Sequence, residues 1–217
     1  MSRDSAFALG TTVKYLKYPV DIRNIKYNNK VEETLKYLKE AEYLPVSTIA
    51  ILLGCSRGIA QKLMVKMWEA HLVKCIEITT YSTPSMLFKL WVNSLSTLPR
   101  NANEACRLAM LGAFYARTKK ELPGFEWNLV KTKRSKVKKN VYAEMVYLSG
   151  TKNEKTMLLI DAPRRGENIN PEGDIYIFPT IEEAKVLTPN GKRFTTDIML
   201  MNKNINFANL ISDPVKK

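Results

Sequence analysis

The stretch STIAILLGCSRGIAQKLMVKMWEAHLV, residues 47–73, decides the fold of this chain. Its first part predicts a helix that follows Pro45, with the apolar residues Ile49, Leu52 and Leu53. We expect the small polar residues Ser47 and Thr48 to cap the start of this helix. We expect Gly54 to end it, because glycine readily adopts the left-handed backbone that closes a helix.

The second part of the stretch predicts a helix that begins after Ser56 and runs to about Ala70. Ile59, Leu63 and Met67 recur at intervals of four residues, which places them on one face of that helix. We expect this face to form a buried stripe and the opposite face to meet solvent.

The flanking sequence extends the pattern on both sides. An amphipathic helix is predicted from Lys30, with its apolar face at Val31, Leu35 and Leu38. After residue 73, residues 74–80 and 86–92 alternate like strands, and residues 81–85 form a turn with Pro84. Three helices followed by a β-hairpin are the element order of a winged helix.

The stretch from residue 47 to residue 73 closely resembles the helix-turn-helix segment of bacterial winged-helix regulators. Its ending, Glu69-Ala70-His71-Leu72-Val73, matches the glutamate, alanine, glycine, leucine, valine exit into the wing, with His71 in place of the glycine. A helix C-terminus favours a cation, so we interpret His71 as a cap and not as a ligand. The resemblance implies a fold that binds DNA.

A recognition helix enters the major groove with its N-terminal end. Arginine pairs with guanine and glutamine with adenine, so Arg57 and Gln61 are the expected base-reading residues. We expect Lys62 and Lys66 to meet phosphates. The further candidates in this module are Ser47, Thr48, Ser56 and Gly58 in the helices and Tyr81, Ser82 and Lys89 in the wing.

The composition supports a polyanionic partner. The chain has 217 residues and a net charge of +13, and such an excess attracts nucleic acid. No apolar run approaches the ~20 residues of a membrane-spanning helix, and the start lacks a signal-peptide pattern. Three widely spaced cysteines and a single histidine predict no disulfide framework and no metal site. We expect a cytoplasmic protein that binds double-stranded DNA without a cofactor.

The second half of the chain predicts a small α/β domain. A helix is expected from Glu104 to Glu121, followed by strands at 125–130, 141–148, 156–160 and 174–178, a helix at 181–187 and a strand at 194–201. We therefore divide the chain into an N-terminal arm (1–29), a winged-helix domain (30–99) and an α/β domain (100–217). The arm is expected to be a short strand or a basic segment along a phosphate backbone.

The densest charge run of the chain lies at residues 131–139. It is either a solvated hairpin tip or a finger that binds phosphates. As candidate DNA contacts we take Lys131, Lys133, Arg134, Lys136, Lys138 and Lys139.

Placed behind a winged helix, this half is similar to the C-terminal domain of the replication-relaxation family of Gram-positive plasmids and conjugative elements. The resemblance rests on residues 142–145, 158–161 and 195–200 and on the order of elements. It implies a fold related to restriction endonucleases, in which Glu144 and Asp161 are the candidate Mg²⁺ ligands. Pro163 stands where that chemistry needs a lysine, so we expect a degenerate, inactive form.

The sequence thus predicts an α+β protein with an N-terminal winged helix-turn-helix and a small α/β domain. The expected function is non-enzymatic, sequence-selective binding of double-stranded DNA, as a transcription regulator or as a replication or transfer accessory of a mobile element. A Mg²⁺-dependent nuclease and a protein-interaction scaffold stay open as alternatives. So do a homodimer and a protein partner for the second half.

Overall fold

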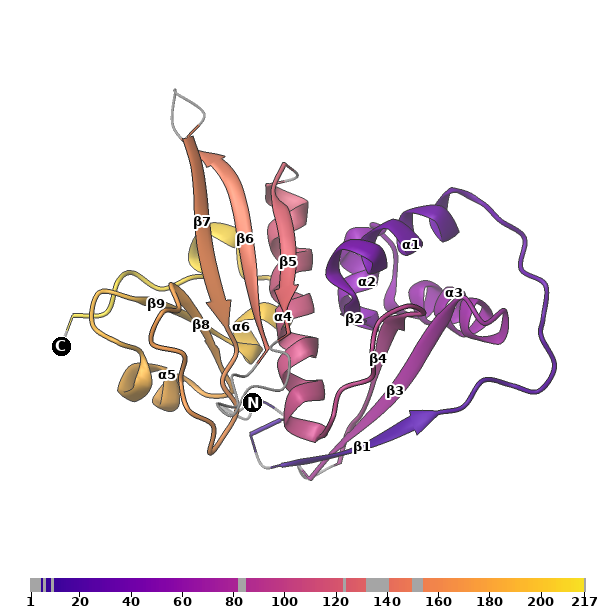
Figure 1. The fold of residues 1–217 in the computed structure, drawn as a ribbon, viewed down its shortest axis with the longest axis horizontal. Helices are drawn as coiled ribbons and strands as arrows, with labels where there is room; N and C mark the ends of the chain where they lie inside the picture. The colour runs from indigo at the N-terminus through magenta and orange to yellow at the C-terminus, as the bar shows by residue number, and fades with distance from the viewer. Residues whose placement is uncertain are drawn as a thin grey trace.

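The computed structural model describes residues 5, 7–8, 10–81, 85–122, 124–131, 141–149 and 154–216. The fold is mixed α+β with two separate sheets (Figure 1). The first part of the chain contains β1 (Thr11–Leu16), α1 (Asn29–Ala41), β2 (Tyr43–Pro45), α2 (Val46–Leu52), α3 (Arg57–Glu69), β3 (Val73–Thr80) and β4 (Leu87–Asn93). The second part contains α4 (Ala102–Glu121), β5 (Glu126–Val130), β6 (Tyr142–Ser149), β7 (Glu154–Asp161), β8 (Ile175–Phe178), α5 (Ile181–Leu187), β9 (Arg193–Thr196), α6 (Asp197–Met201) and the 3-10 helix η1 (Phe207–Asn209).

The first sheet has the strand order β1-β3-β4-β2, and all neighbouring strands are antiparallel. β3 and β4 form the predicted hairpin, in which Ile76 lies opposite Leu90. β2 pairs with β4 and thereby ties the residues before α2 to the hairpin. Of the two expectations for the N-terminal arm, the short strand is present as β1, which pairs with β3 along its whole length.

The second sheet has the order β5-β6-β7-β8-β9. β5, β6 and β7 form an antiparallel meander, whereas β8 and β9 run parallel to their neighbours. The predicted strand at 194–201 is wrong beyond residue 196. There the Thr196 hydroxyl accepts the N–H of Met199 and caps α6. The first residue of α6, Asp197, is buried and pairs with Arg164.

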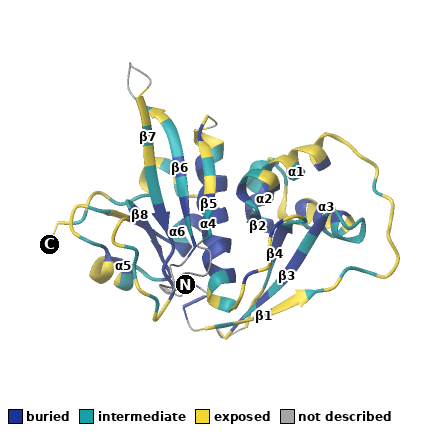
Figure 2. Cartoon of the chain, viewed as in Figure 1, coloured by how far each residue is buried: buried dark blue, intermediate teal, exposed yellow. Residues whose placement is uncertain are grey.

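One hydrophobic core runs from the first sheet into the second part of the chain. The central helix α4 is buried along most of its length (Figure 2). It packs against β2 so closely that a Cβ atom added to Gly112 would lie 2.1 Å from the carbonyl oxygen of Tyr43. The expected boundary near residue 100 is therefore bridged by shared packing.

None of the described helices is by itself long and apolar enough to cross a membrane. The pair of α2 and α3 meets that criterion only when both are counted together, with a bend of 108° between them.

Candidate nucleic-acid interface

The helices α2 and α3 are joined by the four residues 53–56 and bend by 108° at that break. Gly54 has the left-handed backbone angle φ of +58°, as its position at the end of α2 predicts. The N–H of Cys55 donates to the carbonyl of Ala50 at 3.0 Å, and the N–H of Gly54 donates to that of Ile51 at 3.2 Å. These two bonds close α2 and set the direction in which α3 leaves.

The start of α3 is capped by Ser56, whose hydroxyl accepts the N–H of Ile59 at 3.3 Å. The predicted buried stripe is wrong at Ile59, whose side chain is 51% exposed. Met67 is buried as predicted and Leu63 is partly buried, and the helix also buries Ala60 and Met64 completely. Two neighbouring apolar stripes compete on this helix, and the one with the small Ala60 lets α3 approach the core more closely.

The predicted DNA contacts at the start of α3 and along it are accessible. Ser56, Arg57, Gly58, Lys62 and Lys66 are exposed, and Gln61 is partly exposed. In α2, Ser47 is partly exposed, whereas Thr48 is buried and donates its hydroxyl to the carbonyl of Pro45 at 2.6 Å. The predicted capping by Ser47 and Thr48 is wrong, since Pro45 is the N-cap and no side chain bonds there. Because Thr48 is buried, its side chain is not exposed for the predicted DNA contact.

In the hairpin, Tyr81 is 60% exposed and its N–H donates to the carbonyl of Gly10 at 3.1 Å. Lys89 is partly buried and forms an ion pair with Glu77 at 3.6 Å. Its charge is thereby partly neutralised within the sheet, which leaves Tyr81 as the more accessible contact. Ser82 lies outside the described residues.

Of the charge run 131–139, the structure describes Lys131 alone. Its ammonium group bonds to the Glu42 carboxylate and to the Tyr43 hydroxyl, at 3.1 Å from the latter. The predicted contacts Lys133, Arg134, Lys136, Lys138 and Lys139 lie outside the described residues.

A groove beside α3 was not predicted from the sequence. Residues 17–28, between β1 and α1, run as an extended segment past α3 (Figure 1). The segment and α3 enclose a groove of about 490 Å³, whose cationic side chains are Arg23, Lys26, Lys30, Lys62 and Lys66. The sequence signal was the interleaving of basic and apolar residues at 22–30, in a stretch without helical or strand periodicity.

The segment is held against α3 at several points. The N–H of Arg23 donates to the carbonyl of Glu69 at 3.1 Å, and its guanidinium pairs with the Glu69 carboxylate at 3.3 Å. His71 has a φ of +59°, stacks on Tyr18 with the ring centroids 4.4 Å apart, and bonds through Nε2 to the carbonyl of Pro19 at 3.0 Å. His71 therefore closes α3 in the left-handed conformation that favours glycine, and its ring also anchors the segment.

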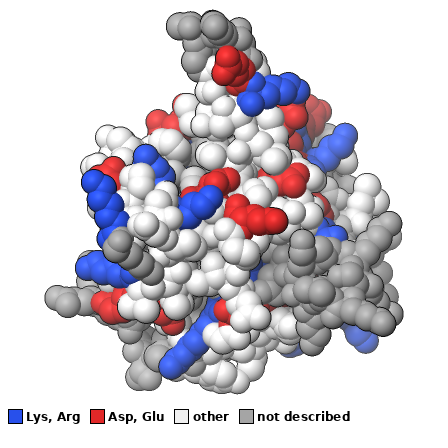
Figure 3. All heavy atoms as spheres, turned by 60° about the vertical axis from the view of Figure 1, so that its left-hand side comes forward, with Lys and Arg blue, Asp and Glu red and all other residues white. Residues whose placement is uncertain are grey.

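The excess of positive charge is not evenly spread over the molecule. On the face seen in Figure 3, Lys and Arg side chains alternate with Asp and Glu across a largely uncharged surface. The groove beside α3 differs, because Glu69 is the one acidic residue among the described residues that line it, and it is paired with Arg23.

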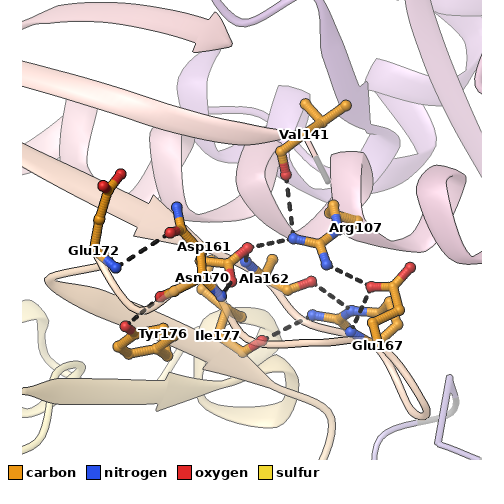
Figure 4. Close-up of polar contacts among 10 residues, drawn as sticks. Arg107, Val141, Asp161, Ala162, Glu167, Asn170, Glu172, Tyr176 and Ile177 are labelled. Atoms are coloured by element: carbon orange, nitrogen blue, oxygen red, sulfur yellow. Dashed lines mark hydrogen bonds and ion pairs between the residues drawn. The ribbon is translucent and has the colours of Figure 1, made fainter. Parts of the chain in front are cut away.

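Glu144 and Asp161, the candidate Mg²⁺ ligands of the alternative nuclease hypothesis, have separate partners. Asp161 is buried at the end of β7, where it is paired with the guanidinium of Arg107 (Figure 4). Its two oxygens also accept the N–H of Ala162 at 2.9 Å and the N–H of Asn170 at 3.1 Å. Glu144 lies opposite Leu159 in the sheet and accepts a bond from the side-chain amide of Asn128 at 3.3 Å.

Arg107 belongs to a larger network of buried charges. Its guanidinium also bonds to Glu167 and to the carbonyl of Val141, at 3.1 Å from the latter (Figure 4). Nearby, Arg164 pairs with Asp197 at 2.8 Å, and the hydroxyl of Ser5 donates to the same carboxylate at 2.8 Å. Burial raises the pKa of Asp197, while Arg164 and Ser5 act in the opposite direction. Removal of one partner from such a pair would leave a buried charge without compensation.

The buried cysteines are poor nucleophiles and poor metal ligands. Burial raises the pKa of Cys75 to about 12 and that of Cys106 to about 11. Both thiols therefore keep their protons at neutral pH, whereas the thiolate is the reactive form. Cys55, in the turn before α3, is the partly exposed cysteine.

Comparison of the chain with protein-family models, curated proteins and solved structures gave no match to any of them.

Proposed function

We propose that residues 11–93 form a winged helix and that it binds double-stranded DNA with α3 in the major groove. The observation that carries this proposal is the junction of α2 and α3: a four-residue turn with a left-handed glycine and a bend of 108°. Helix-turn-helix motifs join two helices at about 90–120° through a turn of three or four residues. The hairpin of β3 and β4, with β2 paired to β4, supports the same architecture.

In this proposal the N-terminal end of α3 reads the bases. Arg57 is exposed in the first turn, and Gln61 lies one turn further along the helix. Each bidentate side-chain contact to a base contributes about 1–3 kcal/mol of discrimination against the wrong base. The backbone at Gly58 is open, because a Cβ atom there would meet the Ser56 hydroxyl only at 4.0 Å.

We propose that the second half supports the DNA-binding module and does not cut DNA. The helix α4, the antiparallel strands β5 to β7 and the parallel strands β8 and β9 favour the restriction-endonuclease-like architecture implied by the resemblance. In this chain the guanidinium of Arg107 and two backbone N–H groups take up the oxygens of Asp161. A cation that belongs to the protein thus stands beside the carboxylate that a nuclease would use for Mg²⁺.

On the resemblance of the sequence to the replication-relaxation family, we propose the role of a regulator, or of a replication or transfer accessory, of a mobile element. The test is to select duplexes from a randomised pool with the intact protein and to compare the affinity for the selected and random duplexes. We expect a reproducible site, with Arg57→Ala and Gln61→Ala each lowering the preference by about 5- to 150-fold, the equivalent of ~1–3 kcal/mol. Recovery of no preferred duplex by the wild-type protein would overturn the proposal.

A further inference from the structure

The groove between residues 23–30 and α3 combines two kinds of surface. Its apolar lining is Ile25 from the segment and Leu63 and the half-exposed Ile59 from α3. The cations come from both sides of the groove, with Arg23, Lys26 and Lys30 from the segment and the start of α1, and Lys62 and Lys66 from α3. The ligand that fits must therefore be anionic along its length and carry apolar surface between its charges.

A nucleic-acid backbone has this alternation. Its phosphates carry one negative charge per nucleotide, and the deoxyribose between two phosphates offers C–H groups to an apolar wall. An acidic protein helix would place its charges on one side and its apolar residues on the other, whereas here the cations come from both walls. Charge complementarity and the position of the groove beside α3 favour a strand of the DNA duplex.

We propose that this groove binds the sugar-phosphate backbone of one strand of the duplex whose major groove α3 enters. The inference rests on the proposed function and adds Arg23, Lys26 and Lys30 to the DNA contacts. Lys62 and Lys66 form one wall of the groove and these three residues form the other. The DNA strand lies between them.

The segment is already in place before DNA arrives. Its contacts to Glu69 and His71 fix its position along α3 in the free protein. Because an ordered segment loses little conformational entropy on binding, its cations contribute more to affinity than the same cations on a disordered arm would. The ion pair between Arg23 and Glu69 is 3.3 Å long, and the Arg23 side chain is 73% exposed, so its guanidinium remains accessible to a phosphate.

The test compares two double variants that lose the same charge. Lys26→Gln with Lys30→Gln removes two cations from the groove, and Lys36→Gln with Lys39→Gln removes two exposed cations of α1 that do not line it. The probe is a fluorescein-labelled random duplex of about 20 base pairs, two turns of the double helix. Its anisotropy is measured with the full-length proteins over a series of salt concentrations.

We expect the slope of log K against log salt to fall by about 0.9 for each phosphate that no longer meets a cation, hence by about 1.8 for the groove variant. The slope of the α1 variant stays close to that of the wild type. Equal slopes for the two variants, with the wild type still binding the duplex, would overturn the groove assignment and leave the proposed function intact. Failure of the wild type to bind any duplex would instead refute the proposed function. Tighter binding to the labelled single strand than to the duplex would show that the groove takes unpaired DNA, which also contradicts the proposal.

Discussion

Replacement of Asp161 by alanine tests whether the buried network in the second half is structural or is a metal site. Asp161 is 1% exposed and accepts bonds from Arg107, from the N–H of Ala162 and from the N–H of Asn170. Its removal takes away one of the two carboxylates that pair with the buried guanidinium of Arg107 and leaves Glu167 as the other. Loss of one partner from a buried ion pair lowers the free energy of unfolding by about 3–5 kcal/mol, out of the roughly 5–15 kcal/mol typical of a folded protein.

The assay is thermal and urea unfolding followed by circular dichroism. A loss of this size corresponds to a fall in Tm of roughly 10 °C for a protein of this length. Asp174→Ala is the matched control, because Asp174 pairs with Lys192 at 2.8 Å while both side chains are 33% exposed. The other oxygen of Asp174 accepts the N–H of Leu159 at 2.9 Å, so we expect the control to lose about 1–2 kcal/mol, less than Asp161→Ala.

Two results would refute this reasoning. One is an Asp161→Ala variant that unfolds at the same urea concentration as the wild type. The other is a rise in the wild-type Tm on addition of millimolar Mg²⁺ that disappears in the variant, because it would mean that Asp161 binds metal in spite of Arg107.

Two further predictions concern the contacts that join the halves of the chain. Gly112→Ala should lower the free energy of unfolding by about 1–3 kcal/mol in urea titrations, because its Cβ atom would lie 2.1 Å from the Tyr43 carbonyl oxygen. Gly58→Ala meets no such contact and should be neutral or stabilising by up to about 1 kcal/mol. A larger loss of stability for Gly58→Ala than for Gly112→Ala would contradict the packing of α4 on β2. Glu40 pairs with Lys119 at 2.7 Å, and although burial raises its pKa, the bonds from Lys119 and Tyr115 lower the pKa overall. A lowered pKa in the folded state stabilises the protein above the unfolded value of about 4.3, and this contribution disappears as pH falls through the folded pKa. The difference in unfolding free energy between wild type and Glu40→Gln should therefore be constant near neutral pH and shrink in acid, and a difference that grows in acid would exclude this role.

Much of the first half was predictable because its signals are local. Gly54 and Ser56 mark the turn before α3 by their own backbone preferences, and the alternation of β3 and β4 needs no distant partner. The helix α5 has the predicted bounds of residues 181–187 for the same reason, with Thr180 as its cap.

The sequence-based predictions fail where contacts between residues far apart in the chain determine the structure. Two apolar stripes of α3 are equally plausible in the sequence, and only packing against the core selects the one that leaves Ile59 exposed. β2 has three residues, one of them a proline, and exists because β4 lies beside it. The groove required the segment around Arg23 to fold back on Glu69, 46 positions away in the chain. The pairing of Arg107 with Asp161 is equally remote, at 54 positions.

The most direct test of the central claim is to locate α3 on DNA. An iron chelate that cleaves nearby DNA is attached to a cysteine introduced as Lys62→Cys, on the exposed side of α3, in a chain with Cys55→Ser. The remaining thiols are buried with raised pKa values and should not react. We predict cleavage focused at the centre of the bound site, and none from the same chelate at Lys39→Cys on α1. Bound DNA that is not cut from position 62, or is cut equally from position 39, would contradict the placement of α3 in the major groove.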